Sequence, residues 1–284
     1  PGLIKADGSR YPFRDLCGAG VAYKLAWRLL QLAAGNSGVS DRGSALPPEW
    51  RELLIQMLAL ASMGVIADVV PLVGENRVIA RFGLSRLKES PLTGVRELVE
   101  ASGLAGENVG AEDVGFKLGP RLNACGRLGH AREAVELLTV ASPERASEIA
   151  ERLSKMNDAR RETERCIASR AEELAIAAGM TGTDRRAIVL AEEGWHQGVV
   201  GICCSRLVQR FHRPTILLAV HGEGDDAVCH GSGRSIDGFN LHAALVQCGQ
   251  HLTSFGGHDM AAGLKLPKRN LPAFIERFTH ECNQ

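Results

Sequence analysis

The spacing of apolar positions predicts that the first half of the chain is helical. Residues 16–34 repeat apolar side chains every three or four positions, which is the period of one helix face. The same period predicts further helices over residues 49–63, 78–88 and 94–102. A stretch rich in Gly, Ser and Pro over residues 35–48 is typical of a loop.

Residues 143–179 are expected to form a single long helix. The side chains that recur on one face are Ile149, Leu153, Met156, Thr163, Ile167, Leu174 and Ala178. Eight acidic and seven basic side chains nearly cancel along the same segment. At 1.5 Å per residue such a helix is about 50 Å long. A small domain cannot cover that length, so we expect the helix to bridge two domains.

Beyond residue 179, short apolar runs alternate with helical patterns. The alternation predicts a small α/β domain with a mixed sheet. The expected strands are residues 187–191, 215–220 and 261–266, and the expected helices are residues 199–209, 241–248 and 271–282.

Composition adds a domain count and a constraint on charge. The chain has 284 residues, which is enough for two domains of ordinary size. The 33 basic and 33 acidic residues give a formal net charge of zero, which removes the simplest argument for a protein that binds a polyanion but leaves local patches open. Of the basic residues 26 are Arg, which suits bidentate phosphate contacts and equally reflects a GC-rich coding bias.

The eight cysteines include no C-x-x-C pair, and several lie in apolar runs. Free thiols of this kind are typical of a reducing compartment, so we expect a cytoplasmic protein. No run of about 18 apolar residues is present, and we expect no membrane association. The chain opens at Pro1 in a loop-like segment, so we expect it to be a piece of a longer protein.

Asp68 is the one carboxylate in an apolar run over residues 64–72. An ionised carboxylate in apolar surroundings is costly unless it is paired, hydrogen-bonded or bound to a metal. Asp68 is therefore a candidate metal ligand. The alternatives are a cap of the turn before Pro71 and an ion pair with Arg77.

Residues 119–129 place Arg121, Asn123 and Arg127 among three glycines. Glycine lets a backbone approach a ligand closely, and Arg offers a planar fork to phosphate. An ordinary turn between helices explains the same composition.

Residues 194–201 follow a predicted strand and open a predicted helix, whose N-terminus would receive an anion. Trp195 is placed either to stack on a base or to pack. His196 is placed either to donate to phosphate or to cap the turn.

Residues 231–235 form the sharpest local candidate, because Ser232 and Arg234 lie among small residues that predict a tight, phosphate-binding loop. The segment lacks the Lys and the spacing of a P-loop, so it does not predict nucleoside triphosphate binding. His258 lies on a Gly-rich bend before a predicted strand and would add a donor beside Arg234. No complete active site emerges from these motifs.

Six motifs occur in one order along nearly the whole chain. They are LCGAG, SMGVIADVVPLVGENR, GPRLNACGRLG, GWHQGVVGI, GSGRS and FGGHDMAAG. The series resembles the bacterial RecJ exonucleases of the DHH phosphoesterase superfamily, and the resemblance covers roughly residues 10–280.

The resemblance implies a 5′→3′ exonuclease that degrades single-stranded DNA from its 5′ end in repair and recombination, with Mn²⁺ or Mg²⁺. It implies an α/β fold in which residues 1–142 are the helical C-terminal part of a DHH catalytic domain. Residues 143–179 would be the connector helix, and residues 180–284 the DHH-associated nucleic-acid-binding domain. The single strand would pass between the two domains.

Site residues follow from the same resemblance, position by position. Asp68 matches a catalytic metal-ligand aspartate, and Ser232 and Arg234 match residues that hold the phosphate of the DNA end. His196 and His258 would line the same groove. The remaining matches, whose individual roles stay open, lie near the catalytic cleft and are Arg121, Asn123 and Arg127.

The chain departs from the family pattern in one large respect. The aspartate-rich strand end, the second aspartate and the Asp-His-His triplet are absent from the 284 residues, and so is a C-terminal domain of the OB type. A two-metal site needs several carboxylates. We therefore expect most metal ligands to lie upstream of Pro1, and the chain alone to bind metal poorly and to cleave no DNA.

Three alternatives remain open on the sequence. One is a smaller phosphodiesterase of the same superfamily that acts on short oligonucleotides or cyclic dinucleotides. Another is a non-catalytic module that binds single strands or a partner protein. The last is a metabolic α/β enzyme whose Gly-rich loops bind a cofactor, although no G-x-G-x-x-G follows a predicted strand.

Overall fold

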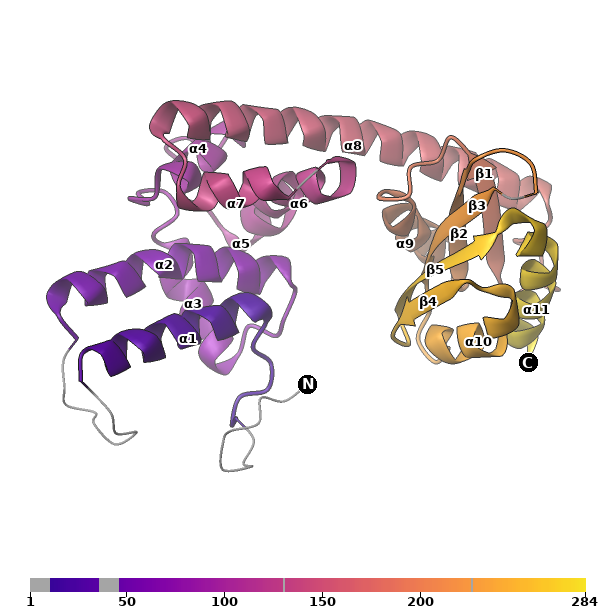
Figure 1. Cartoon of the computed structure of the whole chain (residues 1–284), viewed down its shortest axis with the longest axis horizontal. Helices are drawn as coiled ribbons and strands as arrows, with labels where there is room; N and C mark the ends of the chain where they lie inside the picture. The colour runs from indigo at the N-terminus through magenta and orange to yellow at the C-terminus, as the bar shows by residue number, and fades with distance from the viewer. Residues whose placement is uncertain (1–10, 36–45, 130, 226) are drawn as a thin grey trace. The chain divides into compact units, whose positions relative to one another are not determined.

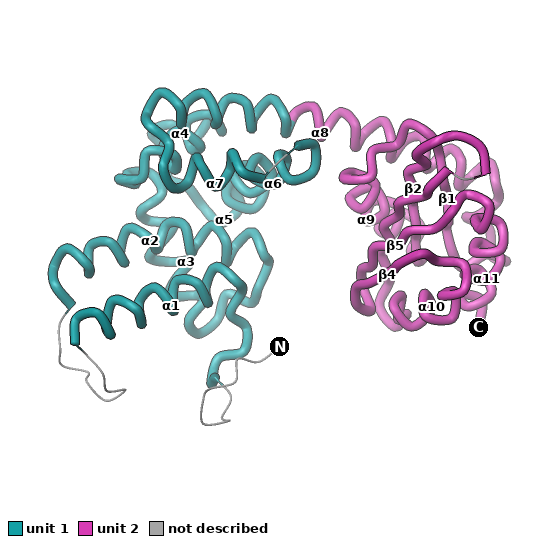
Figure 2. The backbone as a smooth tube through the Cα atoms, viewed as in Figure 1, with its two compact units in different colours: residues 1–157 teal, residues 158–284 magenta. Residues whose placement is uncertain are grey.

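The computed structural model describes residues 11–35, 46–129, 131–225 and 227–284. The chain divides into two compact units, residues 1–157 and residues 158–284 (Figure 1, Figure 2). Most of the loop expected over residues 35–48 lies outside the described residues.

The first unit is built from helices. Their bounds are α1 (Gly18–Ala33), α2 (Pro48–Ala67), α3 (Gly74–Leu84), α4 (Thr93–Ala101), α5 (Ala111–Asp113), the π-helical turn η1 (Val114–Leu118), α6 (Gly119–Leu128) and α7 (Arg132–Thr139). Helix α2 starts at Pro48, because a proline at the first helical position loses no hydrogen bond and already has a helical φ. It packs against α1 and α3, while η1, α4 and α7 surround a second apolar core.

Helix α2 is unusually long and apolar. Among the described residues it is the one helix long and apolar enough to cross a bilayer by length and composition. The core helix of a soluble protein meets the same test, and α2 buries Leu54, Ala59, Met63 and Val65 within its unit.

The long helix predicted over residues 143–179 is confirmed as α8 (Pro143–Ala177). The division between the two units falls inside it, after Asn157. In the first unit it buries Ile149 and Leu153, and in the second unit it buries Ile167.

The second unit contains the mixed sheet that the sequence predicts. Its strands are β1 (Ile188–Glu193), β2 (Thr215–His221), β3 (Val228–Arg234), β4 (Ser254–Gly257) and β5 (Ala261–Pro267), in the order β1-β2-β3-β5-β4. Strands β1 and β2 are parallel, and every other pair is antiparallel. The α/β fold with a helical first part is therefore confirmed, and β3 and β4 are two strands that the apolar pattern missed.

Three helices cover the sheet, namely α9 (Val200–Phe211), α10 (Leu241–Gln247) and α11 (Leu271–Asn283). Helices α10 and α11 lie on one face, and α9 lies on the other (Figure 1). The α10–α11 face holds the main apolar core, with Ile216 and Leu218 on β2 and Phe274 and Phe278 on α11. Helix α9 contacts β2 and β3, and Gly256 on β4 and Gly263 on β5 are exposed. One half of this second face therefore stays open.

All eight cysteines are free thiols, and every one except Cys166 is buried. Burial raises the pKa of the Cys203 and Cys204 thiols to about 12. These thiols therefore stay protonated at neutral pH and pack as small apolar side chains.

Candidate phosphate-binding site

Ser232 and Arg234 lie on strand β3, in the interior of the sheet. The expectation of a tight loop at residues 231–235 is therefore wrong. The glycines here serve packing, because a Cβ at Gly231 would lie 2.7 Å from a methyl group of Leu218, and one at Gly233 would lie 3.0 Å from a methyl group of Leu241. Since side chains alternate along a strand, Ser232 and Arg234 point to the opposite face, the one that α9 partly covers.

The start of α9 lies directly on these two side chains. A Cβ built on Gly201 would be 3.1 Å from the Ser232 Oγ and 3.4 Å from the Arg234 Nη2. The first turn of a helix presents backbone N–H groups and a partial positive charge. A hydroxyl, a guanidinium and a helix N-terminus thus meet at one point, which is the chemistry that binds a phosphate group.

Arg234 has no acidic partner in the described part of the chain. Its Nη1 donates to the Gly233 carbonyl oxygen at 2.8 Å, and no carboxylate among the described residues forms an ion pair with it. A half-buried guanidinium without a carboxylate is available to an anion from outside.

Next to this point the exposed surface of the sheet consists of the glycines Gly256 and Gly263, which we call the glycine floor. Ser232 pairs with Gly263 on β5, and Gly263 pairs with Gly256 on β4. A Cβ at Gly256 would meet nothing within 4 Å, and one at Gly263 would meet only a carbonyl oxygen at 4.0 Å. The open half of the sheet face therefore lets a ligand approach the backbone closely.

His258 follows β4 at the edge of this floor. Its backbone N–H donates to the Ala261 carbonyl oxygen at 2.9 Å, and Ala261 pairs with Arg234. The imidazole is exposed, and its Nδ1 lies 3.2 Å from the Asp259 Oδ1. His258 is thus placed at the register of Arg234, and its predicted role in the groove stays a prediction.

His196 and Trp195 occupy the loop between β1 and α9. The His196 Nδ1 accepts a hydrogen bond from the Gly198 N–H at 3.1 Å, so this imidazole caps the turn that precedes α9. Trp195 is buried, with 6% of its surface exposed. Of the alternatives left open for Trp195, packing is the one observed.

Asp68 is the C-cap of α2 and is exposed. The expectation of a carboxylate in apolar surroundings is wrong, because residues 64–67 extend α2 and bring Asp68 to its exposed end. Within the described residues Asp68 forms no side-chain hydrogen bond and no ion pair, including with Arg77. The preceding residue, Ala67, lies against the start of α6, 3.4 Å from a Cβ built on Gly119.

Residues 119–128 form helix α6, so the interpretation of this motif as a turn is wrong. Asn123 and Arg127 lie one helical turn apart and are exposed. Arg121 is half-buried, and its Nε donates to the Ser154 Oγ on α8 at 2.9 Å. Arg121 also donates from Nη1 to the Lys117 carbonyl oxygen at 2.9 Å, so it links α6 to its neighbours.

We expect Arg121→Ala to lower the free energy of unfolding of the first unit by about 1–2 kcal/mol, because it removes hydrogen bonds from a charged group. Urea denaturation measures this difference. Asn123→Ala, at an exposed position of the same helix, is the matched control and is expected to change stability by less than about 0.5 kcal/mol. Equal stability of the two variants would contradict the linking role of Arg121.

The described residues do not by themselves fit a two-metal centre. No group of three or more His, Cys, Asp or Glu side chains among them is placed to share a metal ion. Asp68 supplies one carboxylate, and a two-ion site needs several.

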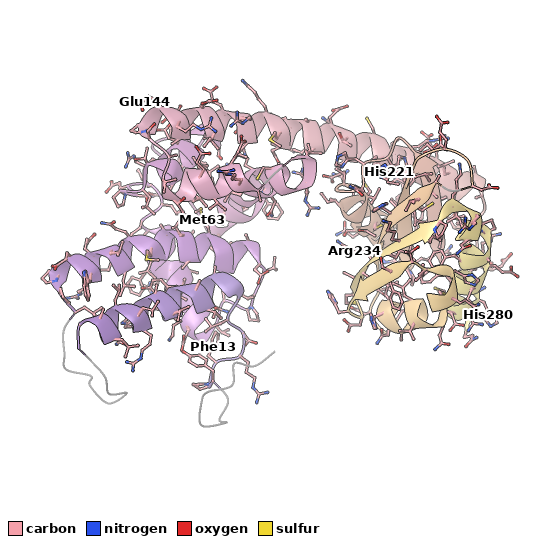
Figure 3. All side chains as sticks on the ribbon, in the orientation of Figure 1. Phe13, Met63, Glu144, His221, Arg234 and His280 are labelled. Atoms are coloured by element: carbon pink, nitrogen blue, oxygen red, sulfur yellow. The ribbon has the colours of Figure 1, made fainter. Side chains whose placement is uncertain are left out.

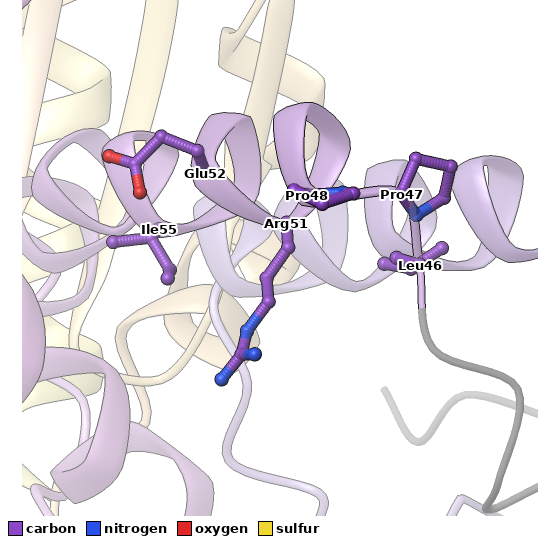
Figure 4. A pocket seen from close by; sticks show the side chains of 6 residues that line it. All are labelled: Leu46, Pro47, Pro48, Arg51, Glu52 and Ile55. Carbon is purple, nitrogen blue, oxygen red and sulfur yellow. The ribbon is translucent and has the colours of Figure 1, made fainter.

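A separate hollow lies beside the start of α2 and contains none of the predicted site residues (Figure 4). It is lined by Leu46, Pro47, Pro48, Arg51, Glu52 and Ile55.

Sequence reasoning missed three glycines of the site. Gly201 lets α9 approach Ser232 and Arg234, and Gly256 and Gly263 keep the floor open. The signal was present as Gly-x-x-Gly over residues 198–201 at a helix start, as the glycine pair at residues 256–257, and as Gly263 inside the predicted strand over residues 261–266.

Comparison with known proteins identifies the class first. Residues 184–284, which contain the sheet and its three helices, match the family model of the DHHA1 domain. Over a longer span the chain is similar to proteins named single-stranded-DNA-specific exonuclease RecJ. It is 41% identical to that of Bacillus subtilis over 273 residues, covering 96% of this chain and 32% of the relative. It is 35% identical to that of Escherichia coli over 274 residues, covering 94% of this chain and 46% of the relative.

Solved structures agree with the sequence comparison. The crystal structure of RecJ in complex with Mn²⁺ from Thermus thermophilus matches with a TM-score of 0.77 and 32% identity, over 95% of this chain and 37% of that one. A crystal structure of exonuclease RecJ bound to manganese matches with a TM-score of 0.77 and 31% identity, over 96% of this chain and 63% of that one. The resemblance drawn from the six motifs is therefore confirmed, and the chain is similar to proteins named RecJ over nearly its whole length. It spans 32–46% of the length of the curated relatives it matches.

Proposed function

We propose that this chain is part of a metal-dependent exonuclease that degrades single-stranded DNA in the 5′→3′ direction. The observation that carries the proposal is the meeting of Arg234, Ser232 and the start of α9 on an open, glycine-floored sheet face. These groups would hold a phosphate of the strand, and the similarity to single-stranded-DNA-specific exonucleases supports DNA as the source of that phosphate.

The finer parts of the proposal follow from the resemblance to the RecJ exonucleases and from the composition of the chain. RecJ of Thermus thermophilus crystallised with Mg²⁺ and with Mn²⁺, which supports one of these ions as the cofactor. We propose a role in DNA repair and recombination, action from a 5′ end, and a cytoplasmic location without a membrane. The free, buried thiols support a reducing compartment.

We propose a separate role for each of three consecutive segments of the chain. Residues 1–142 would contribute to a DHH catalytic domain, residues 143–179 would connect, and residues 180–284 would bind nucleic acid. In the last part, Ser232 and Arg234 would bind and orient a phosphate, with His196 and His258 beside them. Asp68 would supply one ligand to a metal ion, which activates water for phosphodiester hydrolysis when bound.

We expect the chain alone to hydrolyse no DNA, because one exposed carboxylate cannot hold two ions and orient a water molecule. The assay uses a 5′-phosphorylated single strand with Mn²⁺. Strand degradation that Asp68→Ala abolishes would contradict this expectation.

The chain is nevertheless expected to bind single strands, because the phosphate-binding groups lie within residues 158–284. Binding should persist in Asp68→Ala and weaken as salt is added, since phosphate contacts release counterions. A non-catalytic binding module predicts the same binding, so nuclease activity distinguishes the two alternatives. In a longer protein that contains this chain, the proposal predicts a nuclease activity that Asp68→Ala abolishes, and the binding module predicts none.

A further inference from the structure

Three basic side chains lie on the sheet face that carries Ser232 and Arg234. His230 precedes Ser232 by two residues on β3, so it points to the same face. In register, His230 pairs with Ala219 on β2 and with Lys265 on β5. The ring of His221, two residues beyond Ala219, packs edge-on against His230 with centroids 5.4 Å apart. We refer to His221, His230 and Lys265 as the basic cluster.

The basic cluster has no acidic partner among the described residues. Its nearest neighbours in register on this face are Ser254 on β4 and Glu192 on β1. The Glu192 carboxylate is engaged by Arg170 of α8, with an Nη2–Oε1 distance of 2.9 Å. Burial, together with the charges of Lys265 and His221, lowers the pKa of His230 below its usual range.

Positive charges on basic side chains that face one another without a carboxylate repel, which disfavours the protonated form of His230. An anion placed between these side chains would relieve the repulsion. The cluster is also accessible, because His221 is exposed and the other two side chains are half-buried. Figure 3 labels His221 and Arg234, which lie on neighbouring strands of the same sheet.

We infer that the basic cluster is a second phosphate subsite, which binds the phosphate next along the single strand from the one held by Ser232 and Arg234. Residues two apart on a strand are about 6.7 Å apart, an interval similar to that between successive phosphates of an extended single strand. The inference rests on the proposed function, since both subsites would hold one DNA strand.

The subsite should strengthen as the pH falls. A phosphate attracts the imidazolium form of His230, so bound DNA raises the affinity of this side chain for a proton. By linkage, protons then raise the affinity for DNA. Lys265 supplies the attraction that remains when the His230 imidazole is neutral.

The test compares a ligand that reaches one subsite with a ligand that reaches both. The full 284-residue chain is titrated with thymidine 5′-monophosphate and with a short 5′-phosphorylated oligothymidylate, at about pH 6 and pH 8. Lys265→Ala and His230→Gln should each weaken oligothymidylate binding about fivefold at pH 6 and leave the mononucleotide unchanged. The double variant His221→Gln, His230→Gln should lose the gain in oligothymidylate affinity between pH 8 and pH 6.

Lys268→Ala is the matched control, because Lys268 follows β5 but already pairs with Glu193 at 2.9 Å. Melting temperatures of all variants establish that the fold is intact. Unchanged oligothymidylate affinity in Lys265→Ala and His230→Gln, with both ligands weakened by Arg234→Ala, would overturn the second subsite and leave the proposed function standing. If Arg234→Ala weakens neither ligand, the proposed function itself fails.

Discussion

Arg234→Ala is expected to lower the affinity of this chain for a 5′-phosphorylated single strand by at least about tenfold, because hydrogen bonds to charged groups contribute about 1.5–3 kcal/mol each. The guanidinium lies at the start of α9 beside Ser232, and no described carboxylate competes for it. Fluorescence anisotropy at low salt measures the affinity. The slope of log K against log salt should also fall by roughly one, as for the loss of one phosphate contact.

Arg210→Ala is the matched control for this result. Arg210 lies near the other end of α9, and its Nη1 already bonds to the Glu172 carboxylate at 2.8 Å. We expect its loss to change DNA affinity by less than about twofold, as for an exposed ion pair. An equal loss of affinity in both variants would show that general charge, and not the geometry around Arg234, attracts the strand.

Gly94→Ala is expected to destabilise the first unit by about 3 kcal/mol, through overpacking of a buried helix contact. A Cβ at Gly94 would lie 1.7 Å from the Leu137 carbonyl oxygen, so α4 and α7 would have to separate. Urea denaturation followed by far-UV circular dichroism measures the change. Strand binding below the unfolding transition should stay unchanged, because the groups that we propose to bind phosphate belong to residues 158–284.

The control for Gly94→Ala is Gly126→Ala. Gly126 lies in α6, and a Cβ there would meet nothing within 4 Å. Alanine is the better helix former, so Gly126→Ala should raise stability by about 0.5–1 kcal/mol. The account of the α4–α7 contact would be wrong if Gly94→Ala were as stable as Gly126→Ala.

The local pattern of apolar residues was sufficient to predict an element where that element buries a continuous apolar surface. Helix α8 and strand β2 were predicted within about two residues, because α8 repeats apolar side chains at helical spacing and β2 is a continuous apolar run that is buried on both faces. Strand β3 escaped prediction because its sequence, VCHGSGR, has glycines where it packs against Leu218 and Leu241. Those contacts come from other strands and helices, and no local pattern contains them.

Asp68 is the second position at which the local sequence pattern did not predict the structure. A short apolar run does not distinguish a buried strand from the last turn of a helix. Residues 64–67 continue α2, and the carboxylate reaches the surface at its end. Whether residues 64–67 form a strand or continue the helix depends on packing against α1 and α6, which the sequence does not state.

The candidate site was identified in its residues but not in its geometry. The motif around Ser232 and Arg234 pointed to phosphate from composition, and the resemblance gave the same pair. The contact of Ser232 and Arg234 with Gly201 depends on the crossover from β1 through α9 to β2. This crossover places the start of α9 over β3. That arrangement is a property of the whole sheet.

The central claim is that Ser232, Arg234 and the start of α9 bind a phosphate of a single DNA strand. Its most direct test is a titration of the ¹⁵N-labelled chain with a 5′-phosphorylated oligothymidylate, followed by amide chemical shifts. We predict saturable shifts at Gly201 and Ser232, none at Leu245 or Phe274 beneath the opposite face, and loss of the shifts in Arg234→Ala. Saturable shifts that avoid Gly201 and Ser232, or that persist in Arg234→Ala, would contradict the account.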